Sequence, residues 1–206
     1  MIRRLVFDLD DTLIRSDHIF SEFIGFSGED AKIDRLLYPL AGRSYHEIVK
    51  IITHQVDERF AKDFMDSYLH WYDTFGWQLH SPFENIQELL TVTQAFSKSD
   101  IPIVTNKRCS AAQRILAFFF PRLRFDVRGI GEVKEVDKKY HLMSLREHFE
   151  GTADLVYVGD TLGDKNDAKN SGVDFAGACW KKKPEEFPLN TKCFSTPTDL
   201  LEWALC

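Results

Sequence analysis

Short apolar runs alternate with helical patterns over most of this 206-residue chain. The apolar runs are residues 5–7, 101–104, 123–127, 155–158 and 173–178, and we interpret them as strands. The first and the fourth are apolar on both faces, which is typical of strands covered on two sides. Because strands that alternate with helices are joined by right-handed crossovers, the pattern predicts an α/β fold with a doubly wound, mainly parallel sheet.

The helices between these runs have recognisable start signals. Residues 81–84 (Ser-Pro-Phe-Glu) combine a capping residue, a proline at the first helical position and an acid, and they predict one helix start. Ser110, Lys138 and Thr196 are expected to open three further helices. Each start is followed by apolar residues at helical spacing, which predicts one buried face per helix.

One region breaks the alternation. Between about residues 14 and 80 there is no strand pattern, while Phe60, Phe64, Tyr68 and Tyr72 recur at helical spacing. We expect an all-helical cap domain, residues 14–81, inserted into a core domain that comprises residues 1–13 and 82–206. Most of the aromatic residues at positions 71, 72, 75 and 77 are expected to form the cap's own core.

Composition excludes several functions. A net charge of −6 argues against binding to nucleic acid or to an anionic membrane surface. The basic run at residues 181–183 is followed by a proline and two glutamates, so we interpret it as a solvated loop. The longest apolar stretch, residues 115–120, is far shorter than the roughly 20 residues that span a bilayer. We therefore expect a soluble protein, either a monomer or a homodimer. Four cysteines without ligand spacing predict reduced thiols in the cytoplasm.

Polar residues follow three of the apolar runs: residues 8–12 (DLDDT), 105–107 (TNK) and 159–164 (GDTLGD). Ligands bind at the carboxyl ends of the strands in a doubly wound sheet, so we expect these residues to meet in one crevice. An ordinary polar turn would also explain any one of them alone, because Asp, Thr, Asn and Gly are common turn residues.

The acidic residues among them predict a bound cation. They are Asp8, Asp10, Asp160 and Asp164. Carboxylates about 4 Å apart repel by roughly 4 kcal/mol per pair at an effective dielectric constant near 20, so a fold keeps such a group only with a compensating charge. Oxygen ligands without organised His or Cys suit Mg²⁺, and Lys107 and Lys138 add positive charge for an anion. We therefore predict a magnesium-assisted phosphoryl site in which one carboxylate is a nucleophile and another transfers protons.

The same motifs resemble those of the haloacid dehalogenase superfamily. "DLDDT" is similar to its D-x-D-x-T signature, "IVTNK" to its second motif, and "VYVGDTLGDKNDAKNSG" to its fourth. "FDVRGIGE" resembles the stretch that leads to the family's lysine motif, and the helical insert lies where phosphoglycolate-phosphatase-like members carry a cap. The resemblance covers nearly the whole chain. It implies a phosphatase that hydrolyses a small phosphomonoester, phosphoglycolate-like or a nucleotide, through an aspartyl-phosphate.

The resemblance also implies roles for single residues. Asp8 would be the nucleophile and a metal ligand, and Asp10 the general acid and base, with its backbone carbonyl on the metal. Thr12 would steady this arrangement, and Thr105 with the backbone N–H of Asn106 would hydrogen-bond the phosphoryl group.

The remaining motif residues would hold the metal and the phosphate. Asp160 would bind Mg²⁺ and Asp164 would support it directly or through a water, with a helix cap in Thr161-x-x-Asp as the alternative for Asp164. We prefer Lys138 as the motif lysine because it lies four residues before Leu142, and Lys139 and Lys134 are the alternatives.

Two further residues are candidates for substrate binding. Lys107 is one, and Arg43 in the expected cap is the other, where it would clamp a carboxylate or a second phosphate, or would simply lie on the surface beside a turn. Two other functions stay open: a phosphomutase of the same superfamily and a non-catalytic domain that only binds a ligand. A dehalogenase is disfavoured because it needs no metal and leaves Asp160 and Asp164 unexplained.

Overall fold

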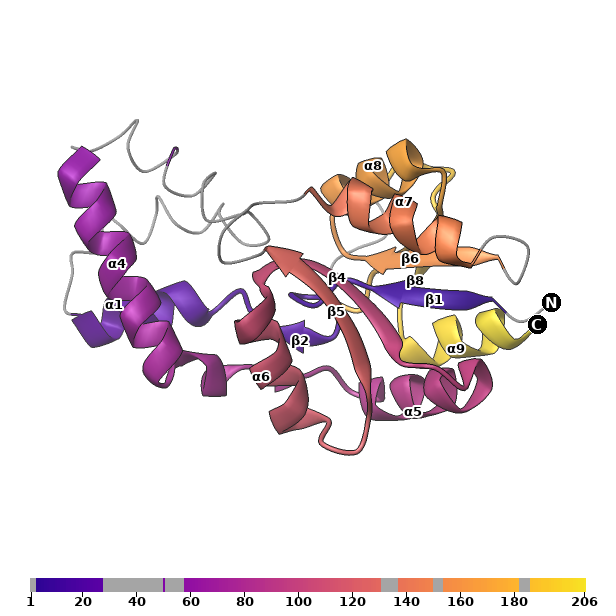
Figure 1. The fold of residues 1–206 in the computed structure, drawn as a ribbon, viewed down its shortest axis with the longest axis horizontal. Helices are drawn as coiled ribbons and strands as arrows, with labels where there is room; N and C mark the ends of the chain where they lie inside the picture. Colours follow the sequence, from indigo (N-terminus) through magenta and orange to yellow (C-terminus); the bar gives the residue numbers. More distant parts are fainter. Residues whose placement is uncertain (1–2, 28–49, 51–57, 131–136, 150–153, 182–185) are drawn as a thin grey trace. The chain divides into compact units, whose positions relative to one another are not determined.

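The computed structural model describes residues 3–27, 50, 58–130, 137–149, 154–181 and 186–206 (Figure 1). The chain divides into two compact units. The first comprises Met1–Ile14 and Pro82–Cys206, and the second comprises Arg15–Ser81. Among the described residues, no helix is both long enough and apolar enough to cross a membrane.

The first unit contains a parallel six-stranded sheet with the strand order β5-β4-β1-β6-β7-β8. Its strands are β1 (Arg4–Phe7), β4 (Ile101–Arg108), β5 (Phe125–Ile130), β6 (Leu155–Gly159), β7 (Asp174–Ala178) and β8 (Cys193–Phe194). Helices α7 (Lys138–His148) and α8 (Leu162–Ser171) cover one face, and α5 (Ile86–Ser97), α6 (Cys109–Phe119) and α9 (Pro197–Leu205) cover the other (Figure 1). This architecture confirms the predicted doubly wound α/β fold.

The strand order reverses direction at the centre of the sheet. From β1 the chain proceeds outward through β4 to β5, and it then returns to β6 on the other side of β1 and continues to β7 and β8. The carboxyl ends of β1 and β6 therefore flank the switch point, where open α/β sheets bind their ligands. β1 and β6 are paired in register, with Phe7 opposite Val158, so the residues that follow them begin at the same level.

A largely apolar layer under α7 and α8 supports this end of the sheet. Val6, Leu142 and Leu145 are completely buried there together with Tyr157, the one hydroxyl-bearing ring in this cluster of the described core. Val6 and Asp8 are two positions apart on the same strand path, so Asp8 extends toward the α7 and α8 side just beyond the core.

Three local predictions need correction. Helix α5 begins at Ile86 rather than near Pro82, because Asn85 has a left-handed backbone (φ 62°) that interrupts any helix through residues 82–85. Residues Ser81–Pro82 instead form β3, which pairs with β2 (Ile14–Arg15). Helix α6 begins at Cys109 without a side-chain cap, one residue before the expected Ser110. The polar residues 105–107 lie within β4 and not in a turn after it.

Two predicted helix starts are confirmed. The Thr196 hydroxyl accepts a hydrogen bond from the Asp199 backbone N–H at 3.1 Å, with Pro197 in the first turn of α9. Helix α7 begins at Lys138, as expected.

The second unit contains α1 (Ile19–Ser27), α4 (Glu58–Thr74) and the short helix η2 (Gly76–Leu79). The four aromatic residues that predicted a helix all lie on α4. An aromatic cluster joins α1 to α4, and its members are Phe23, Phe64, Tyr68, Trp71 and Tyr72. Phe23 lies 5.3 Å from Phe64 and 5.4 Å from Trp71 between ring centroids. Trp71 and Tyr72 are buried as predicted, whereas Phe75 is 37% exposed.

Candidate active site

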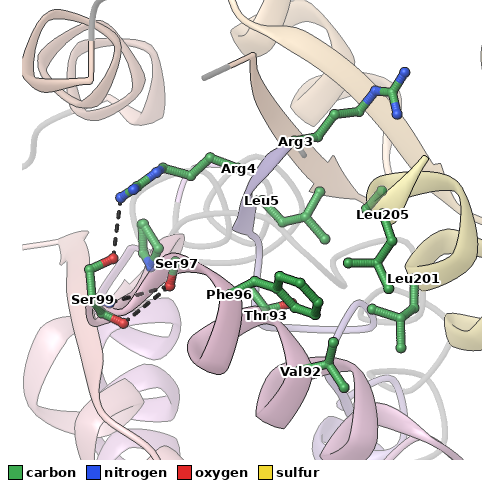
Figure 2. A pocket seen from close by; sticks show the side chains of 12 residues that line it. Arg3, Arg4, Leu5, Val92, Thr93, Phe96, Ser97, Ser99, Leu201 and Leu205 are labelled. Atoms are coloured by element: carbon green, nitrogen blue, oxygen red, sulfur yellow. Dashed lines mark hydrogen bonds between the residues drawn. The ribbon is translucent and has the colours of Figure 1, made fainter. Parts of the chain in front are cut away.

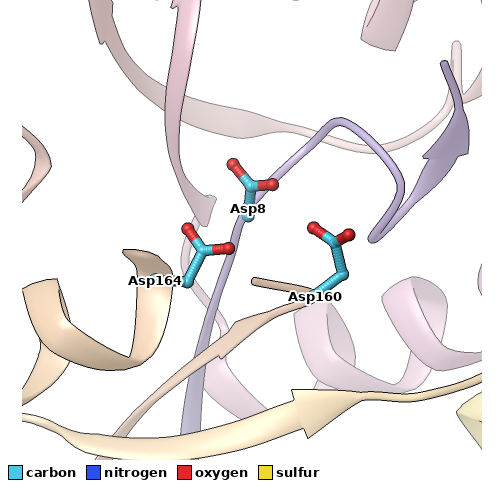
Figure 3. Close-up of side chains that lie close together, drawn as sticks. All are labelled: Asp8, Asp160 and Asp164. Atoms are coloured by element: carbon cyan, nitrogen blue, oxygen red, sulfur yellow. The ribbon is translucent and has the colours of Figure 1, made fainter. Parts of the chain in front are cut away.

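Three buried carboxylates converge at the carboxyl ends of β1 and β6 (Figure 3). Asp8, Asp160 and Asp164 each offer an oxygen, and these oxygens all lie within 4.8 Å of one another. Asp8 follows β1, and its backbone N–H donates to the Val158 carbonyl of β6 at 2.8 Å. Asp160 follows β6 directly, and Asp164 projects from the first turn of α8. Sequence positions far apart thus contribute to one site of concentrated negative charge.

A buried lysine faces this cluster. The Nζ of Lys138 lies 2.7 Å from Asp8 Oδ1 and 2.7 Å from Asp164 Oδ1. Lys138 is the first residue of α7 and its side chain is only 6% exposed. Lys139 instead pairs with Asp137 at 3.1 Å and is 36% exposed. The geometry therefore favours Lys138 over Lys139 as the motif lysine, while Lys134 lies outside the described residues.

Asp164 accepts from three donors, and the Tyr157 hydroxyl lies beside it. Its Oδ2 accepts from the Thr161 backbone N–H at 3.1 Å and from the Thr161 hydroxyl at 2.6 Å, and its own N–H donates back to that hydroxyl at 3.1 Å. Its Oδ1 accepts from Lys138 and lies 3.1 Å from the Tyr157 hydroxyl. Asp164 therefore forms the predicted capping box with Thr161 at the start of α8, and its side chain also belongs to the carboxylate cluster.

Gly159 makes room for Asp164. A Cβ added at Gly159 would lie 2.6 Å from the Cβ and 2.7 Å from the Cγ of Asp164, far inside van der Waals contact. Any other residue at the end of β6 would push the carboxylate away from Lys138. The glycine of the fourth motif therefore has a steric explanation.

The buried Tyr157 hydroxyl contacts the carboxylate cluster. This residue was not predicted from the sequence to be part of the site. Its hydroxyl lies 2.9 Å from the Val104 carbonyl oxygen and 3.1 Å from Asp164 Oδ1, and the residue is completely buried in β6. The Lys138 ammonium lies 5.8 Å from the centre of the Tyr157 ring. A usable signal was present in the sequence, because a tyrosine within an otherwise apolar buried strand must find a partner for its hydroxyl.

Burial and neighbouring charges shift the pKa values of these groups in different directions. Burial raises the pKa of Asp8 well above its ordinary value, against the opposing charge of Lys138, and the carboxylates of Asp164 and Asp160 raise it further. For Asp164 burial acts in the same upward direction, but Lys138 and the Thr161 donors outweigh it and lower the pKa. Burial alone would lower the pKa of Lys138, but Asp164 and Asp8 raise it well above its usual range. Three carboxylates face one ammonium here, and a bound cation would favour the ionised form of Asp8.

Asp10 is not part of the three-carboxylate cluster. Its Oδ1 pairs with the Nζ of Lys107 on β4 at 3.1 Å, and both side chains are largely buried. The expectation that four carboxylates approach one another closely is therefore wrong for Asp10, because Lys107 holds its side chain. The predicted metal contact through the Asp10 backbone carbonyl stays a prediction.

The other predicted residues lie around the same strand ends. Thr12 is completely buried, and its hydroxyl has no hydrogen-bond partner within the part of the chain that the structure describes. The Thr105 hydroxyl accepts the Lys107 backbone N–H at 3.1 Å, and half-buried Asn106 lies between them on β4. Arg43 lies outside the described residues.

The basic run after β7 differs from its predicted state in one respect. Lys181 is not a solvated loop residue, because its Nζ lies 2.8 Å from Asp11 Oδ2 and its side chain is 21% exposed. The carboxylate of Asp11 explains this burial, because it pairs with the ammonium. Asp11 occupies a variable position of the D-x-D-x-T motif and had no predicted role. The other two lysines of the run lie outside the described residues.

Comparison with known proteins agrees with this geometry. Residues 5–178 match the family of haloacid dehalogenase-like hydrolases, whereas no curated protein matches the chain. A predicted phosphatase from Clostridium acetobutylicum has the same fold, with a TM-score of 0.77 at 19% identity over 100% of this chain and 99% of that chain. A haloacid dehalogenase-like family hydrolase from Streptococcus pneumoniae gives 0.75 at 20% identity over 98% of each chain.

A predicted phosphoglycolate phosphatase from Haemophilus somnus gives a TM-score of 0.75 at 18% identity over 98% of this chain and 97% of that chain. At these identities the structures establish the shared fold alone. The family match covers most of the sequence, including every motif that contributes to the carboxylate cluster. The chain is a member of the haloacid dehalogenase-like hydrolase family.

Proposed function

We propose that this protein is a magnesium-dependent phosphatase that hydrolyses a small phosphomonoester through an aspartyl-phosphate on Asp8. The main support is a single juxtaposition: the buried Lys138 ammonium lies 2.7 Å from the Asp8 carboxylate within a group of three carboxylates. A nucleophilic carboxylate must meet a phosphate that is itself negative, and a buried cation beside it lowers that repulsion.

The cluster suits Mg²⁺ in its chemistry. Its ligands are carboxylate oxygens, which a small hard cation prefers, and three carboxyl groups face the single ammonium of Lys138. Because the two oxygens of Asp164 already accept three donors and lie beside the Tyr157 hydroxyl, Asp8 and Asp160 are the residues that would hold the ion directly. The ion would supply positive charge to the phosphoryl oxygens.

The residues of this chain divide the reaction into two displacements. In the first, an Asp8 oxygen attacks phosphorus, the bond to the leaving oxygen breaks, and Asp10 gives that oxygen its proton. In the second, Asp10 takes a proton from water, the water oxygen attacks the phosphorus, and inorganic phosphate leaves with Asp8 restored. Lys138 stays charged throughout, since the pKa of its ammonium is raised well above its ordinary value.

Other residues of the proposal surround this centre. Thr105 and the Asn106 backbone N–H would bind the phosphoryl oxygens, Thr12 would steady the motif, and Lys107 would bind the substrate beside Asp10. The second unit would act as a cap that excludes bulk water, with Arg43 on the leaving group. Small substrates such as phosphoglycolate-like compounds or nucleotides fit a capped site, and the Haemophilus somnus relative is a predicted phosphoglycolate phosphatase. The four free cysteines agree with a reducing cytoplasm.

The deciding experiment measures inorganic phosphate released from an aryl phosphate and from a panel of phosphorylated metabolites while Mg²⁺ is titrated. We expect saturable activation by Mg²⁺, and loss of at least about 10⁴-fold in kcat for Asp8→Asn. Radiolabelled substrate should leave an acid-stable, hydroxylamine-sensitive label on the wild type and none on Asp8→Asn. Full activity in Asp8→Asn would refute the mechanism. Isomerised sugar phosphates without phosphate release would indicate a phosphomutase, and complete silence would indicate a binding domain.

A further inference from the structure

The catalytic motif contains a turn with an unusual backbone. Asp11, which follows Asp10 directly, has φ 55°, and it is one of the described non-glycine residues in the left-handed region. The turn is closed by the Asp11 N–H, which donates to the Ile14 carbonyl at 2.7 Å, and by the Leu13 N–H, which donates to the Leu9 carbonyl at 2.9 Å. A side chain disfavours this conformation, so surrounding contacts must hold it.

Two residues that follow β7 supply such contacts. Lys181 Nζ lies 2.8 Å from Asp11 Oδ2, and the Asp11 side chain is only 7% exposed. The Trp180 indole N–H donates to the Thr12 carbonyl at 3.0 Å. Two consecutive residues of the turn are therefore held by two consecutive residues from another part of the sheet, and we name Trp180 and Lys181 the β7 clamp.

A backbone hydrogen bond and a ring contact fix the β7 clamp to neighbouring elements. The Cys179 backbone N–H, just before the clamp, donates to the Phe194 carbonyl of β8 at 2.9 Å. The Trp180 ring packs edge-on against Phe83 at 6.3 Å between centroids, and the Phe83 N–H donates to the Leu13 carbonyl at 3.2 Å. The turn thus receives external donors at Asp11, Thr12 and Leu13, and all of them come from elements fixed to the sheet.

We propose that Trp180 and Lys181 are positioning residues that set the direction of Asp10 by holding the Asp11–Thr12 turn. This inference rests on the proposed function, in which Asp10 transfers the proton. Lys181 acts through Asp11: its ammonium offsets the cost of the left-handed backbone by pairing with the carboxylate that this backbone directs toward it. The competing explanation is direct contact of the Lys181 ammonium with the substrate phosphate.

The two explanations differ in kinetics and in dependence on Asp11. Positioning of a proton-transfer group changes kcat, whereas loss of a phosphate contact raises KM. If Lys181 acts through Asp11, its removal matters only while Asp11 is present. Asp11→Gly removes the carboxylate and also the conformational cost, because glycine adopts positive φ readily. A contact with substrate would be lost equally in either background.

The experiment compares Lys181→Met, Lys181→Arg, Asp11→Gly and the double variant Asp11→Gly/Lys181→Met in the phosphatase assay. Lys181→Met is expected to lower kcat about tenfold with KM within about twofold, since small misplacement of a reacting group is costly. Lys181→Arg should recover most of the loss, because it keeps the charge. In the Asp11→Gly background the Lys181→Met change should fall below about twofold. Lys192→Met, an exposed lysine over the Trp203 ring, is the matched control and should leave kcat unchanged.

Each other outcome counts against the inference. An increase in KM that persists in Asp11→Gly would make Lys181 a substrate ligand, and unchanged kcat in Lys181→Met would remove its positioning role. If circular dichroism shows that Lys181→Met is unfolded, Trp180→Phe carries the test, because it keeps an aromatic ring near Phe83 and removes the N–H donor. A kcat equal to wild type would then overturn the inference. A wild type without phosphatase activity would refute the proposed function instead, so the two failures are distinguishable.

Discussion

The two units of this protein bury opposite kinds of side chain. In the first unit a network of charged and hydroxyl groups lies beneath the strand ends: Asp8, Lys138, Tyr157, Asp160 and Asp164. In the second unit the aromatic cluster fills the space between α1 and α4. Buried charges are costly to desolvate and contribute little net stability, whereas each buried ring removes about 150–250 Å² of surface from water.

The difference predicts that function and stability are separable in this chain. Substitutions in the charged network should reduce activity strongly, with effects on unfolding that depend on which partner is left unpaired. Substitutions in the aromatic cluster should reduce stability and leave the chemistry on a small substrate nearly intact. Three pairs of variants and the single variant Tyr157→Phe test this separation, and they are ordered by their expected effect on kcat.

Lys138→Met should have the largest effect. It removes the ammonium beside Asp8, and loss of one such preorganised charge lowers kcat by about 10³-fold. Lys139→Met is the matched control, because Lys139 is adjacent in sequence, pairs with Asp137 and is 36% exposed. Phosphate release at saturating substrate is the measurement. A larger loss in Lys139→Met than in Lys138→Met would reverse the assignment of the motif lysine.

Gly159→Ala should come second. The added Cβ would clash with Asp164 at 2.6 Å and displace its carboxylate from Lys138. We expect kcat to fall by about 10²-fold, as for other ångström-scale misplacements near a reacting group. In the control Gly163→Ala, the new Cβ meets only the Thr161 hydroxyl oxygen at 3.4 Å. Equal kcat values for the two alanine variants would show that the position of Asp164 is unimportant.

Tyr157→Phe should reduce kcat by about threefold to tenfold, because the hydroxyl that lies 3.1 Å from Asp164 Oδ1 is lost. It should also change the alkaline behaviour. Burial raises the pKa of Tyr157 well above 10.0, so above pH 10 the unfolded chain releases a proton that the folded chain keeps. Stability linked to Tyr157 is therefore complete below that pH and is lost as the pH rises toward the folded pKa, by up to about 1.4 kcal/mol per pH unit.

Urea unfolding of wild type and Tyr157→Phe on either side of pH 10 measures this contribution. The wild type should lose more free energy of unfolding than the variant over the same interval. Parallel losses in both proteins would mean that the Tyr157 hydroxyl ionises as easily in the folded state as in the unfolded chain.

Trp71→Ala should have the smallest effect on kcat and a large effect on stability. Removal of this buried ring should lower the free energy of unfolding by about 3–5 kcal/mol, with kcat on an aryl phosphate within about twofold below the unfolding temperature. Phe75→Ala is the control, since Phe75 contacts Trp71 at 5.6 Å but is 37% exposed. A loss of kcat in Trp71→Ala as great as in Tyr157→Phe would end the separation between the two units.

Local sequence was a good guide to the fold where one physical cause dominated. Apolar runs marked the five principal strands of the sheet, although β5 begins at Phe125, two residues after the start of its run. The start of α5 was misplaced because residues 81–84 carry the same local signals as a capped helix, and the left-handed Asn85 overrides them. The short strands β2, β3 and β8 were missed, because a strand of two residues is too short to show an alternating hydrophobic pattern.

The site was predicted in outline and not in its details. The order of the motifs indicated which strand ends would carry acids, because parallel strands end at one edge of a sheet. Lys138 and Lys139 could be told apart only by helix phase against Leu142, and the contact with Asp8 is what distinguishes them in space. Lys181 was interpreted as solvated because the residues next to it in sequence are charged. Its partner Asp11 lies 170 positions away, so no local pattern indicates the contact.

By itself the sequence determined the alternation of strands and helices, and with it the sheet and the edge where polar residues gather, because these depend on local periodicity and chain connectivity. The tertiary structure alone decided which charges meet. Asp8 with Lys138, Asp10 with Lys107, and Asp11 with Lys181 are each separated by many residues, and their pairing depends on ångström distances between elements that no local pattern encodes.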